Sequence, residues 1–283
     1  MSFENRLDEL HRRVGELPGA IVAFSGGVDS AFLSEVAHRR LGDRFIAVTA
    51  DSASLPRREL LDCIGLAHSR GWKHIVVPTD ELSSSDYAAN PTNRCYFCKV
   101  ELFTALAPLA TETGFPVLLG TNADDIGDHR PGQVAADEAG ALHPMLDVGL
   151  TKQDIRRASD LLGLATSAKP ASACLASRFA YGVGITREGL ARVEGAEEYL
   201  REAGLRVLRV RDLGNDRARV EVGKDELDLL KASSFEIQTA LLNMGFGEVT
   251  LDEEGYRRGS LNEGIVTIAL GAPRSERSQA EVD

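Results

Sequence analysis

Residues 21–40 read IVAFSGGVDSAFLSEVAHRR, and this stretch decides the fold. The apolar run before Ser25 predicts a buried strand, and the residues after Val28 predict a helix. Two consecutive glycines, Gly26 and Gly27, stand at the junction. Glycine costs backbone entropy on folding, so a pair at this position indicates that a ligand comes close to the backbone. A strand, a glycine turn and a helix start favour phosphate binding, because backbone N–H groups face the anion.

Two better-known glycine motifs do not fit this loop. The Walker pattern requires a lysine that is absent here, and the dinucleotide pattern G-x-G-x-x-G is absent too. The string SGGVDS at 25–30 instead resembles the pyrophosphate loop, S-G-G-x-D-S, of the N-type ATP pyrophosphatase superfamily. The resemblance implies that Asp29 helps to hold Mg²⁺, and that the pyrophosphate of ATP is held by Ser25, Gly26, Gly27, Asp29 and Ser30. The alternative is an ordinary turn capped by Asp29 or Ser30.

The first half of the chain alternates short apolar runs with helical patterns. Strands are expected at 20–24, 45–50, 74–78 and 116–121, and helices at 29–41, 56–71 and 99–114. Strands that are apolar on both faces and separated by helices predict an α/β fold around a buried parallel sheet. The Gly- and Asp-rich segment 122–150 is expected to be a loop.

The pattern changes in the second half. A helix is expected at 186–203, an antiparallel hairpin around a Gly-Asn turn in 206–222, a helix at 224–244 and a strand at 247–252. We therefore expect two domains, a nucleotide-binding domain at 1–170 and a small α+β domain at 171–283. The polar end, 275–283, is expected to be disordered.

Polar residues follow the other predicted strands of the first domain. In open α/β sheets, ligands bind beyond the carboxyl ends of the strands. The segment LLGTNADD, 118–125, places Thr121 there, together with Asp124 and Asp125 as candidate Mg²⁺ ligands. The segment 49–56, which includes Ala50, occupies the same edge, where the superfamily binds adenosine. A solvated turn is the alternative for the two aspartates.

A further helix is expected after Thr151, which suits the N-cap, with Asp154 near the third position. Lys152 in its first turn is a candidate phosphate contact, or else a solvated charge.

Three cysteines point to sulfur chemistry. Cys95 and Cys98 form a C-x-x-C pair, and Cys174 lies in a loop rich in small residues. Together they could bind an iron–sulfur cluster with one open iron. With His129 or His143 as a fourth ligand they could bind zinc, or they could simply be packed. The fourth cysteine, Cys63, lies on an apolar helical stripe and is expected in the core.

The string PASACLASRFAYGVGIT, 170–186, and the string VTLDEEGYRRGSLNEG, 249–264, resemble the LarE family of ATP-dependent sulfur transferases in nickel-pincer cofactor synthesis. The resemblance implies an enzyme that adenylates a carboxylate of pyridinium-3,5-biscarboxylic acid mononucleotide. Sulfur then displaces AMP and leaves a thiocarboxylate. In one branch of the family the cysteine at position 174 gives up its own sulfur. Cys95 and Cys98 make this chain similar to the other branch, in which three cysteines hold a [4Fe-4S] cluster. The resemblance also implies a homohexamer; the sulfur donor is not identified.

The predicted hairpin carries a row of arginines. Arg209 and Arg211 share one face of the first strand, and Arg217 and Arg219 share one face of the second. A turn centred near Gly214 would place Arg211 opposite Arg217 and Arg209 opposite Arg219. Like charges in opposite positions are unfavourable unless an anion or carboxylate lies between them.

A substrate with two carboxylates and a phosphate needs such cations. We expect Arg209 and Arg211 to bind it together with Arg178, next to Cys174. Glu221 is expected either to neutralise an arginine or to bind a metal. The alternative is a solvated, charged hairpin face.

Composition excludes some classes of protein. The 283 residues are 43% hydrophobic and 27% charged, with a formal net charge of −11, which argues against nucleic acid as a partner. No apolar run approaches the length of a membrane span and the first residues do not resemble a secretory leader, so the cytoplasm is the expected location. The alternatives are a tRNA thiolase, which would need a basic RNA-binding face, an ammonia-using synthetase of the same superfamily, or a nucleotide-sensing module without activity.

Overall fold

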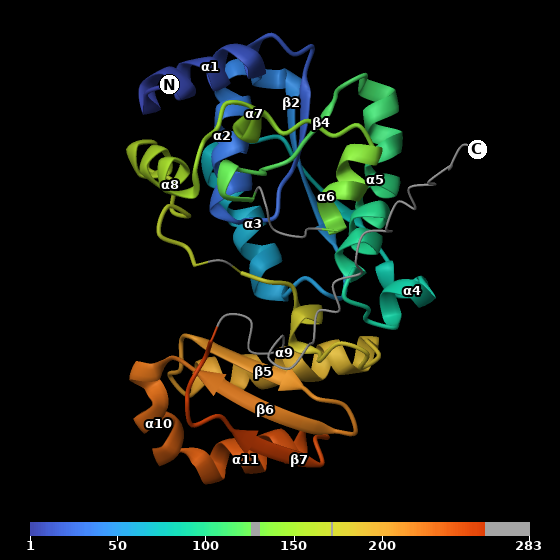
Figure 1. Cartoon of the computed structure of the whole chain (residues 1–283), viewed down its shortest axis with the longest axis vertical. Helices are drawn as coiled ribbons and strands as arrows, with labels where there is room; N and C mark the ends of the chain where they lie inside the picture. Colours follow the sequence, from blue (N-terminus) through green and yellow to red (C-terminus); the bar gives the residue numbers. More distant parts are fainter. Residues whose placement is uncertain (126–130, 171, 258–283) are drawn as a thin grey trace, which may run out of the picture.

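The computed structural model describes residues 1–125, 131–170 and 172–257. Its first half contains a parallel sheet with the strand order β3-β2-β1-β4 (Figure 1). The register pairs Val22 with Ala47 and Ile21 with Val117. The α/β prediction is confirmed. The strands are β1 (Ala20–Ala23), β2 (Phe45–Asp51), β3 (His74–Pro78) and β4 (Val117–Leu118).

Helices cover both faces of this sheet. Val22 and Ala47 belong to a core shared with α1, α2 and α8, whereas Ile21 and Ile46 pack with Leu106 of α5 on the other face. Continuous apolar strands fold in this way because both of their faces need cover. The helices of this half are α1 (Phe3–Gly15), α2 (Val28–Leu41), α3 (Arg57–Arg70), α4 (Ser85–Ala88), α5 (Arg94–Thr113), α6 (Pro131–Glu138), α7 (Pro144–Asp147) and α8 (Lys152–Leu161), with the short turns η1 (Gly42–Arg44), η2 (Glu81–Ser83) and η3 (Ala123–Asp125).

Two sequence predictions for this half were wrong. The segment 122–150 is not simply a loop, since it contains α6 and α7, and Ala135 and Ala136 of α6 are buried. Helix α5 begins at Arg94 and not at residue 99. The C-x-x-C pair therefore lies in the first turns of a helix, where residues three apart share one face.

The second half forms a smaller α+β unit (Figure 1). In its sheet, ordered β5-β6-β7, β5 and β6 are antiparallel and β7 joins β6 in parallel. The helix predicted at 224–244 is broken at Ser233 into two shorter helices. The elements are η4 (Leu175–Arg178), α9 (Arg187–Glu202), β5 (Leu208–Asp212), β6 (Arg217–Val222), η5 (Lys224–Glu226), α10 (Leu227–Ala232), α11 (Ser234–Asn243) and β7 (Glu248–Leu251).

The register of the hairpin differs from the prediction. Arg211 lies opposite Arg219, and Arg209 lies opposite Glu221. The turn is longer than a tight Gly-Asn turn, because Asn215 and Asp216 both adopt positive φ, at 52° and 55°. Because the register shifts by two residues, each side chain stays on its predicted face of the hairpin. The carboxylate of Glu221 now lies in the row of arginines, opposite Arg209.

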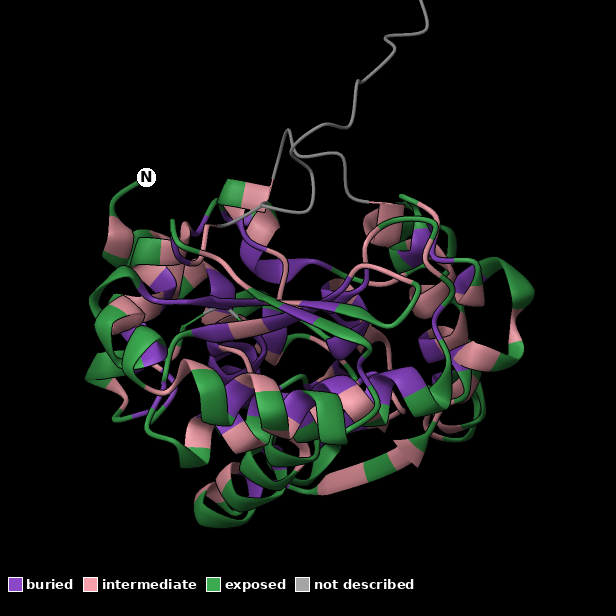
Figure 2. Ribbon diagram, turned by 90° about the horizontal axis from the view of Figure 1, so that it is seen from below, coloured by how far each residue is buried: buried purple, intermediate pink, exposed green. Residues whose placement is uncertain are grey.

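The buried residues gather in the strands and on the inner sides of the helices (Figure 2). One core surrounds β1 and β2, and another lies between α9, α11 and the sheet β5-β6-β7. Tyr87 of α4 belongs to this second core, and Cys98 packs against it. Within the described ranges, no helix combines the length and apolarity needed to cross a membrane. The predicted disordered end, 275–283, lies outside the described residues.

Candidate functional site

The phosphate loop, residues 25–30, links β1 to α2. Gly26 adopts a φ of +72°, and Gly27 is the N-cap of α2 without a side-chain cap. The Ser30 hydroxyl accepts from the Ser25 amide at 3.2 Å and donates to the carbonyl of Gly27 at 3.2 Å. Ser25 itself is exposed. The loop is thus closed by Ser30 while the N-terminus of α2 is capped by no side chain, which suits an anion.

Side chains beneath the loop leave no room for a larger residue. A Cβ atom on Gly26 would lie 2.7 Å from Sγ of Cys63, and a Cβ on Gly120, just after β4, would lie 2.9 Å from the amide nitrogen of Ser30. Cys63 is fully buried, which confirms the prediction that it is a core residue, and burial raises the pKa of its thiol to about 11. The sheet edge and the loop therefore meet backbone to backbone.

Asp29 and Lys152 form an ion pair across the loop. The other oxygen of Asp29, Oδ1, is buried and has no hydrogen-bond partner among the described residues. Burial raises the pKa of Asp29, and the charge of Asp125 adds to this, although Lys152 opposes it. A buried carboxylate oxygen without a partner fits a hard cation such as Mg²⁺.

The two aspartates after β4 have different surroundings. Asp125 accepts from the Asn122 amide at 3.0 Å through Oδ2. Asp124 accepts from the Lys152 amide at 2.8 Å and so adds to the start of α8, where Thr151 and Asp154 form the predicted capping box. Asp125, whose charge acts on Asp29, is better placed than Asp124 to share a cation with it.

His143 connects to the same edge of the sheet. Its Nδ1 lies 2.8 Å from Oγ1 of Thr121, and its Nε2 lies 3.1 Å from Oδ1 of Asp137. Both ring nitrogens are engaged in this way, so the structure places His143 with Thr121 rather than in a zinc site with the cysteines. His129, the other proposed zinc ligand, lies outside the described residues.

The loop that carries Cys174 is fastened to the first half of the chain. The Leu175 amide donates to the carbonyl of Ser54 at 2.8 Å, just beyond the end of β2 where Ala50 lies half-buried. The Asn90 side chain donates to the carbonyl of Ala180 at 2.8 Å. These bonds tie segments more than 80 residues apart into one unit.

The three predicted cysteines lie within electrostatic reach of one another in the structure. Burial raises the pKa of Cys98 to about 12, and the charge of Cys174 contributes next. Partial burial and then the charge of Cys174 also raise the pKa of Cys95. We call these three thiols the cysteine site. Over residues 1–125, 131–170 and 172–257, however, no three His, Cys, Asp or Glu side chains form a group that could hold a metal ion.

Arg178 supports the cysteine loop from below. It is buried and donates to both oxygens of Glu197, at 2.8 and 3.0 Å. It also donates to the carbonyls of Ala173, at 2.7 Å, and Cys174, at 3.1 Å. Burial would raise the pKa of Glu197, but the bonds and charge of Arg178 outweigh it and the pKa falls below the ordinary value. The guanidinium of Arg178 is thus bonded to the carboxylate of Glu197 and to backbone carbonyls at and before Cys174.

The arginine face comprises Arg209, Arg211, Arg219 and Glu221 of the hairpin. Glu221 is fully buried and accepts from Arg211 at 2.9 Å and from Arg219 at 3.0 Å. The expectation that Glu221 neutralises an arginine is confirmed. Arg211 also donates to the carbonyl of Ser177 at 3.0 Å, which joins this face to the cysteine loop.

Arg209 differs from its neighbours. Among the described residues no carboxylate lies within ion-pair distance of it, and its guanidinium stacks 5.0 Å from the ring centre of Tyr256. Burial lowers the pKa of Arg209, and the nearby charge of Arg178 lowers it further. A half-buried cation of this kind is suited to bind an anion.

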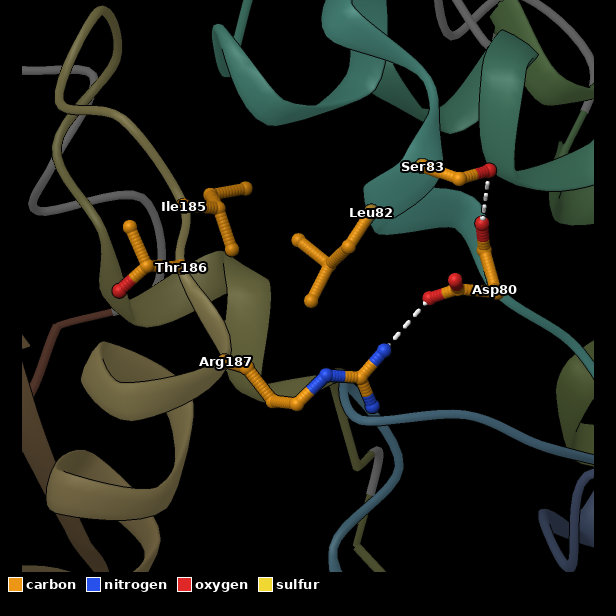
Figure 3. Close-up of a pocket in the computed structure, with 6 residues that line it drawn as sticks. All are labelled: Asp80, Leu82, Ser83, Ile185, Thr186 and Arg187. Carbon is orange, nitrogen blue, oxygen red and sulfur yellow. Dashed lines mark hydrogen bonds and ion pairs between the residues drawn. The ribbon is translucent and has the colours of Figure 1, made fainter.

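A shallow cavity of about 260 Å³ lies elsewhere, between η2 and the start of α9 (Figure 3). Arg187 and Asp80 form an ion pair of 2.8 Å across it, and both side chains are largely exposed. The cavity shares no lining residue with the phosphate loop, the cysteine site or the arginine face. The ion pair links the two halves of the chain, and the cavity is not part of the candidate site.

No protein-family model matches the chain. It is 33% identical over 257 residues to the pyridinium-3,5-bisthiocarboxylic acid mononucleotide synthase of Lactiplantibacillus plantarum, covering 90% of this chain and 93% of that one. This chain belongs to the LarE family. It is also 44% identical to an uncharacterized protein of Synechocystis sp., over 92% of this chain and 98% of the relative. A glutamine-hydrolysing GMP synthase of Chlamydia caviae matches 75 residues at 32% identity, 26% of this chain and 15% of that one.

Three charged residues around the site of this LarE-family protein were not predicted from the sequence: Glu197, Glu59 and Lys169. Glu197 lies four residues before Arg201 on α9, which predicts a surface ion pair and conceals its bonds to Arg178. Lys169 bonds to Glu59 at 2.7 Å, close to Gly26. The only signal for Lys169 was its position five residues before Cys174 in the chain.

Proposed function

We propose that this LarE-family protein is an ATP-dependent sulfur transferase that converts a carboxylate of pyridinium-3,5-biscarboxylic acid mononucleotide into a thiocarboxylate. The relative from L. plantarum is named as a synthase of the corresponding bisthiocarboxylic acid. Replacing a carboxylate oxygen by sulfur requires that the oxygen first become a good leaving group. ATP cleaved at the α–β anhydride supplies this group as AMP.

The docking of the cysteine loop on the loop after β2 is the observation that carries the proposal. The bond from Leu175 to Ser54 fastens Cys174 to the carboxyl edge of the parallel sheet, the edge from which the phosphate loop also emerges. Ligands bind at this edge in open α/β sheets. A carboxylate activated there would lie near the thiols that are to supply or carry sulfur.

In the first step a carboxylate oxygen of the substrate attacks the α-phosphorus of ATP, and the bond to the β-phosphate oxygen breaks. The N-terminus of α2 and the hydroxyls of Ser25 and Ser30 would hold the departing pyrophosphate. Asp29, through the oxygen that has no partner among the described residues, and Asp125 would hold Mg²⁺. Further contacts to the nucleotide are assigned to Gly26, Gly27, Ala50, Thr121, Asp124 and Lys152.

In the second step sulfur attacks the carbonyl carbon, and AMP leaves with the former carboxylate oxygen. Three cysteines are the donor set that the family resemblance implies for an iron–sulfur cluster, so Cys95, Cys98 and Cys174 would hold a [4Fe-4S] group, although over the described residues their side chains do not form a metal-binding group. When bound, such a group supplies an open iron that holds a sulfide. The fastening of the Cys174 loop by Arg178 would keep this ligand in position.

The anionic substrate would meet the arginine face. Arg209 is the strongest candidate, because within the described ranges no carboxylate lies at ion-pair distance from it, although the charge of Glu197 acts on it from farther away. Arg178, Arg211 and Glu221 would fix the shape of the site, since each is already bonded beside Cys174 or Ser177. We also propose the domain boundary at residues 170 and 171, and a homohexamer as implied by the family resemblance.

Release of pyrophosphate tests the proposed function. The protein is incubated with ATP, Mg²⁺ and the pyridinium biscarboxylate mononucleotide, and pyrophosphate is measured with the product mass. We expect release that depends on the pyridinium compound. Asp29→Asn should lower the rate by roughly 100-fold, as loss of one preorganised charge-stabilising group does. Asp43→Asn, on the exposed turn η1 before β2, is the matched control and should keep the full rate.

Anaerobic purification tests the sulfur carrier. We expect iron and labile sulfide to accompany the protein, and to be lost together in Cys95→Ser, Cys98→Ser and Cys174→Ser. An active protein that contains neither iron nor sulfide would contradict the cluster and leave the adenylation step intact.

A further inference from the structure

Lys169 approaches the phosphate loop at Gly26, whereas Lys152 approaches it at Asp29. Its Nζ lies 3.9 Å from the position that a Cβ on Gly26 would occupy. It now bonds to Glu59 at 2.7 Å and to Asp62 at 3.2 Å, both on α3. Lysine at a loop that suits phosphate, yet held by carboxylates, is a group that the proposed reaction has not used.

The backbone of Lys169 is held in place by α8. Arg156 donates to the carbonyl of Ser167 at 2.5 Å and to that of Lys169 at 2.8 Å. The same helix supplies Lys152 to Asp29 at its first turn. Helix α8 thus carries Lys152 itself and, through Arg156, holds the backbone of Lys169.

The carboxylates beneath the loop oppose the approach of an anion. Glu59, Asp62 and Cys63 share one face of α3, and the carbonyl oxygen of Glu59 lies 3.9 Å from the Gly26 Cβ position. Burial would lower the pKa of Lys169, but its bonds to Glu59 outweigh this and raise it, so the side chain carries a full positive charge. Two carboxylates share this single ammonium, whose side chain is long and flexible.

We propose that Lys169 is a pyrophosphate-binding residue that exchanges Glu59 and Asp62 for phosphate oxygens when the loop is occupied. This inference rests on the proposed function, since it needs a polyphosphate at residues 25–30. The exchange is favourable because a phosphate group offers more charge than a carboxylate at similar distance. Lys169 would then strengthen the binding of ATP and pyrophosphate more than the binding of AMP.

Binding of pyrophosphate, ATP and AMP, each with Mg²⁺ and measured by calorimetry, tests the inference. Lys169→Ala should weaken pyrophosphate and ATP by roughly 10-fold or more, as loss of a charged hydrogen bond does, and should change AMP less than twofold. Lys169→Arg should recover part of the loss. Lys73→Ala, at an exposed position before β3, is the matched control and should match the wild type.

Glu59→Gln gives a test of opposite sign. Releasing Lys169 from a competing carboxylate should tighten pyrophosphate binding, whereas a purely structural ion pair predicts unchanged or weaker binding. If Lys169→Ala does not fold, as judged by thermal unfolding, Glu59→Gln and Lys169→Arg decide alone. If the wild type binds pyrophosphate and these variants bind it with the same affinity, only the role of Lys169 would be overturned. A wild type that binds no pyrophosphate would overturn the proposed function as well.

Discussion

Within the part of the chain that the structure describes, one oxygen of Asp29 at the phosphate loop has no partner, whereas on the arginine face both oxygens of Glu221 accept from arginines. The two regions are built from the same kinds of charged side chain. On the arginine face, the ion pairs are buried and join the cysteine loop to the second sheet. At the phosphate loop, both partners of each lysine–carboxylate pair are partly exposed, with side-chain exposures of 18% to 34%. The difference separates groups that hold the fold from groups that can exchange their partners for a ligand.

Arg178→Ala should show the largest effect, and on stability. It leaves the carboxylate of Glu197 buried without its bidentate partner, although Arg201 still contacts one oxygen. Loss of one member of a buried ion pair costs about 3–5 kcal/mol. Chemical denaturation measures this free energy of unfolding. Lys152→Ala should cost far less, because its ion pair with Asp29 is partly exposed. Equal losses would remove the distinction between the two regions.

Arg209→Ala sharpens the comparison within the arginine face. Since no carboxylate lies within ion-pair distance of Arg209 over the described residues, its loss should weaken the pyridinium substrate by roughly 10- to 100-fold, the range for charged hydrogen bonds. Thermal unfolding should change little. Arg217→Ala, at the exposed start of β6, serves as control. A stable variant with unchanged substrate affinity would count against Arg209 as the anion contact.

Gly26→Ala, in the phosphate loop, should lower the free energy of unfolding by less than Arg178→Ala does. The φ of +72° costs an L-residue about 1–2 kcal/mol, and the new Cβ would contact Cys63 at 2.7 Å. Adding Cys63→Ala should recover the part due to contact but not the part due to φ. The two free energies of unfolding are measured side by side. If the double variant recovers no stability, the contact with the Cys63 thiol does not contribute to the loss.

The smallest effect concerns pH. Because Arg178 holds the pKa of Glu197 below its unfolded value, the pair contributes stability that is present above the unfolded pKa and is lost as pH falls through the folded pKa. Denaturation at pH 6 and at decreasing pH below 4.5 should show a loss that is smaller in Glu197→Gln. Asp29 should act in the opposite direction, since burial raises its pKa. Parallel curves for the wild type and Glu197→Gln would contradict this assignment.

Much of the fold followed from the sequence, because it depends on local patterns. The strands around Val22 and Ala47 and the capping box at Thr151 lie where periodicity and capping residues place them. The start of α5 was missed because the helical pattern was recognised only from residue 99, after the C-x-x-C pair. The hairpin register was missed because Asn215 and Asp216 lengthen the turn through positive φ, which residue type does not dictate.

The surroundings of the site depend on contacts that are distant in sequence. The charge of Cys174 acts on Cys98, 76 residues earlier, only after the cysteine loop has docked on Ser54. Glu197 and Lys169 gain their roles in the same way, from partners on other helices. Sequence spacing could suggest three convergent thiols, but not which charged groups beside them are already neutralised.

Transfer of a labelled oxygen tests the central claim most directly. The pyridinium biscarboxylate mononucleotide is prepared with ¹⁸O in its carboxylates and incubated with the protein, ATP, Mg²⁺ and a sulfide source, and AMP is analysed by mass. The account predicts that each AMP carries one ¹⁸O, since the carboxylate oxygen attacks the α-phosphorus and leaves with AMP. Unlabelled AMP, or ADP with labelled phosphate, would contradict it.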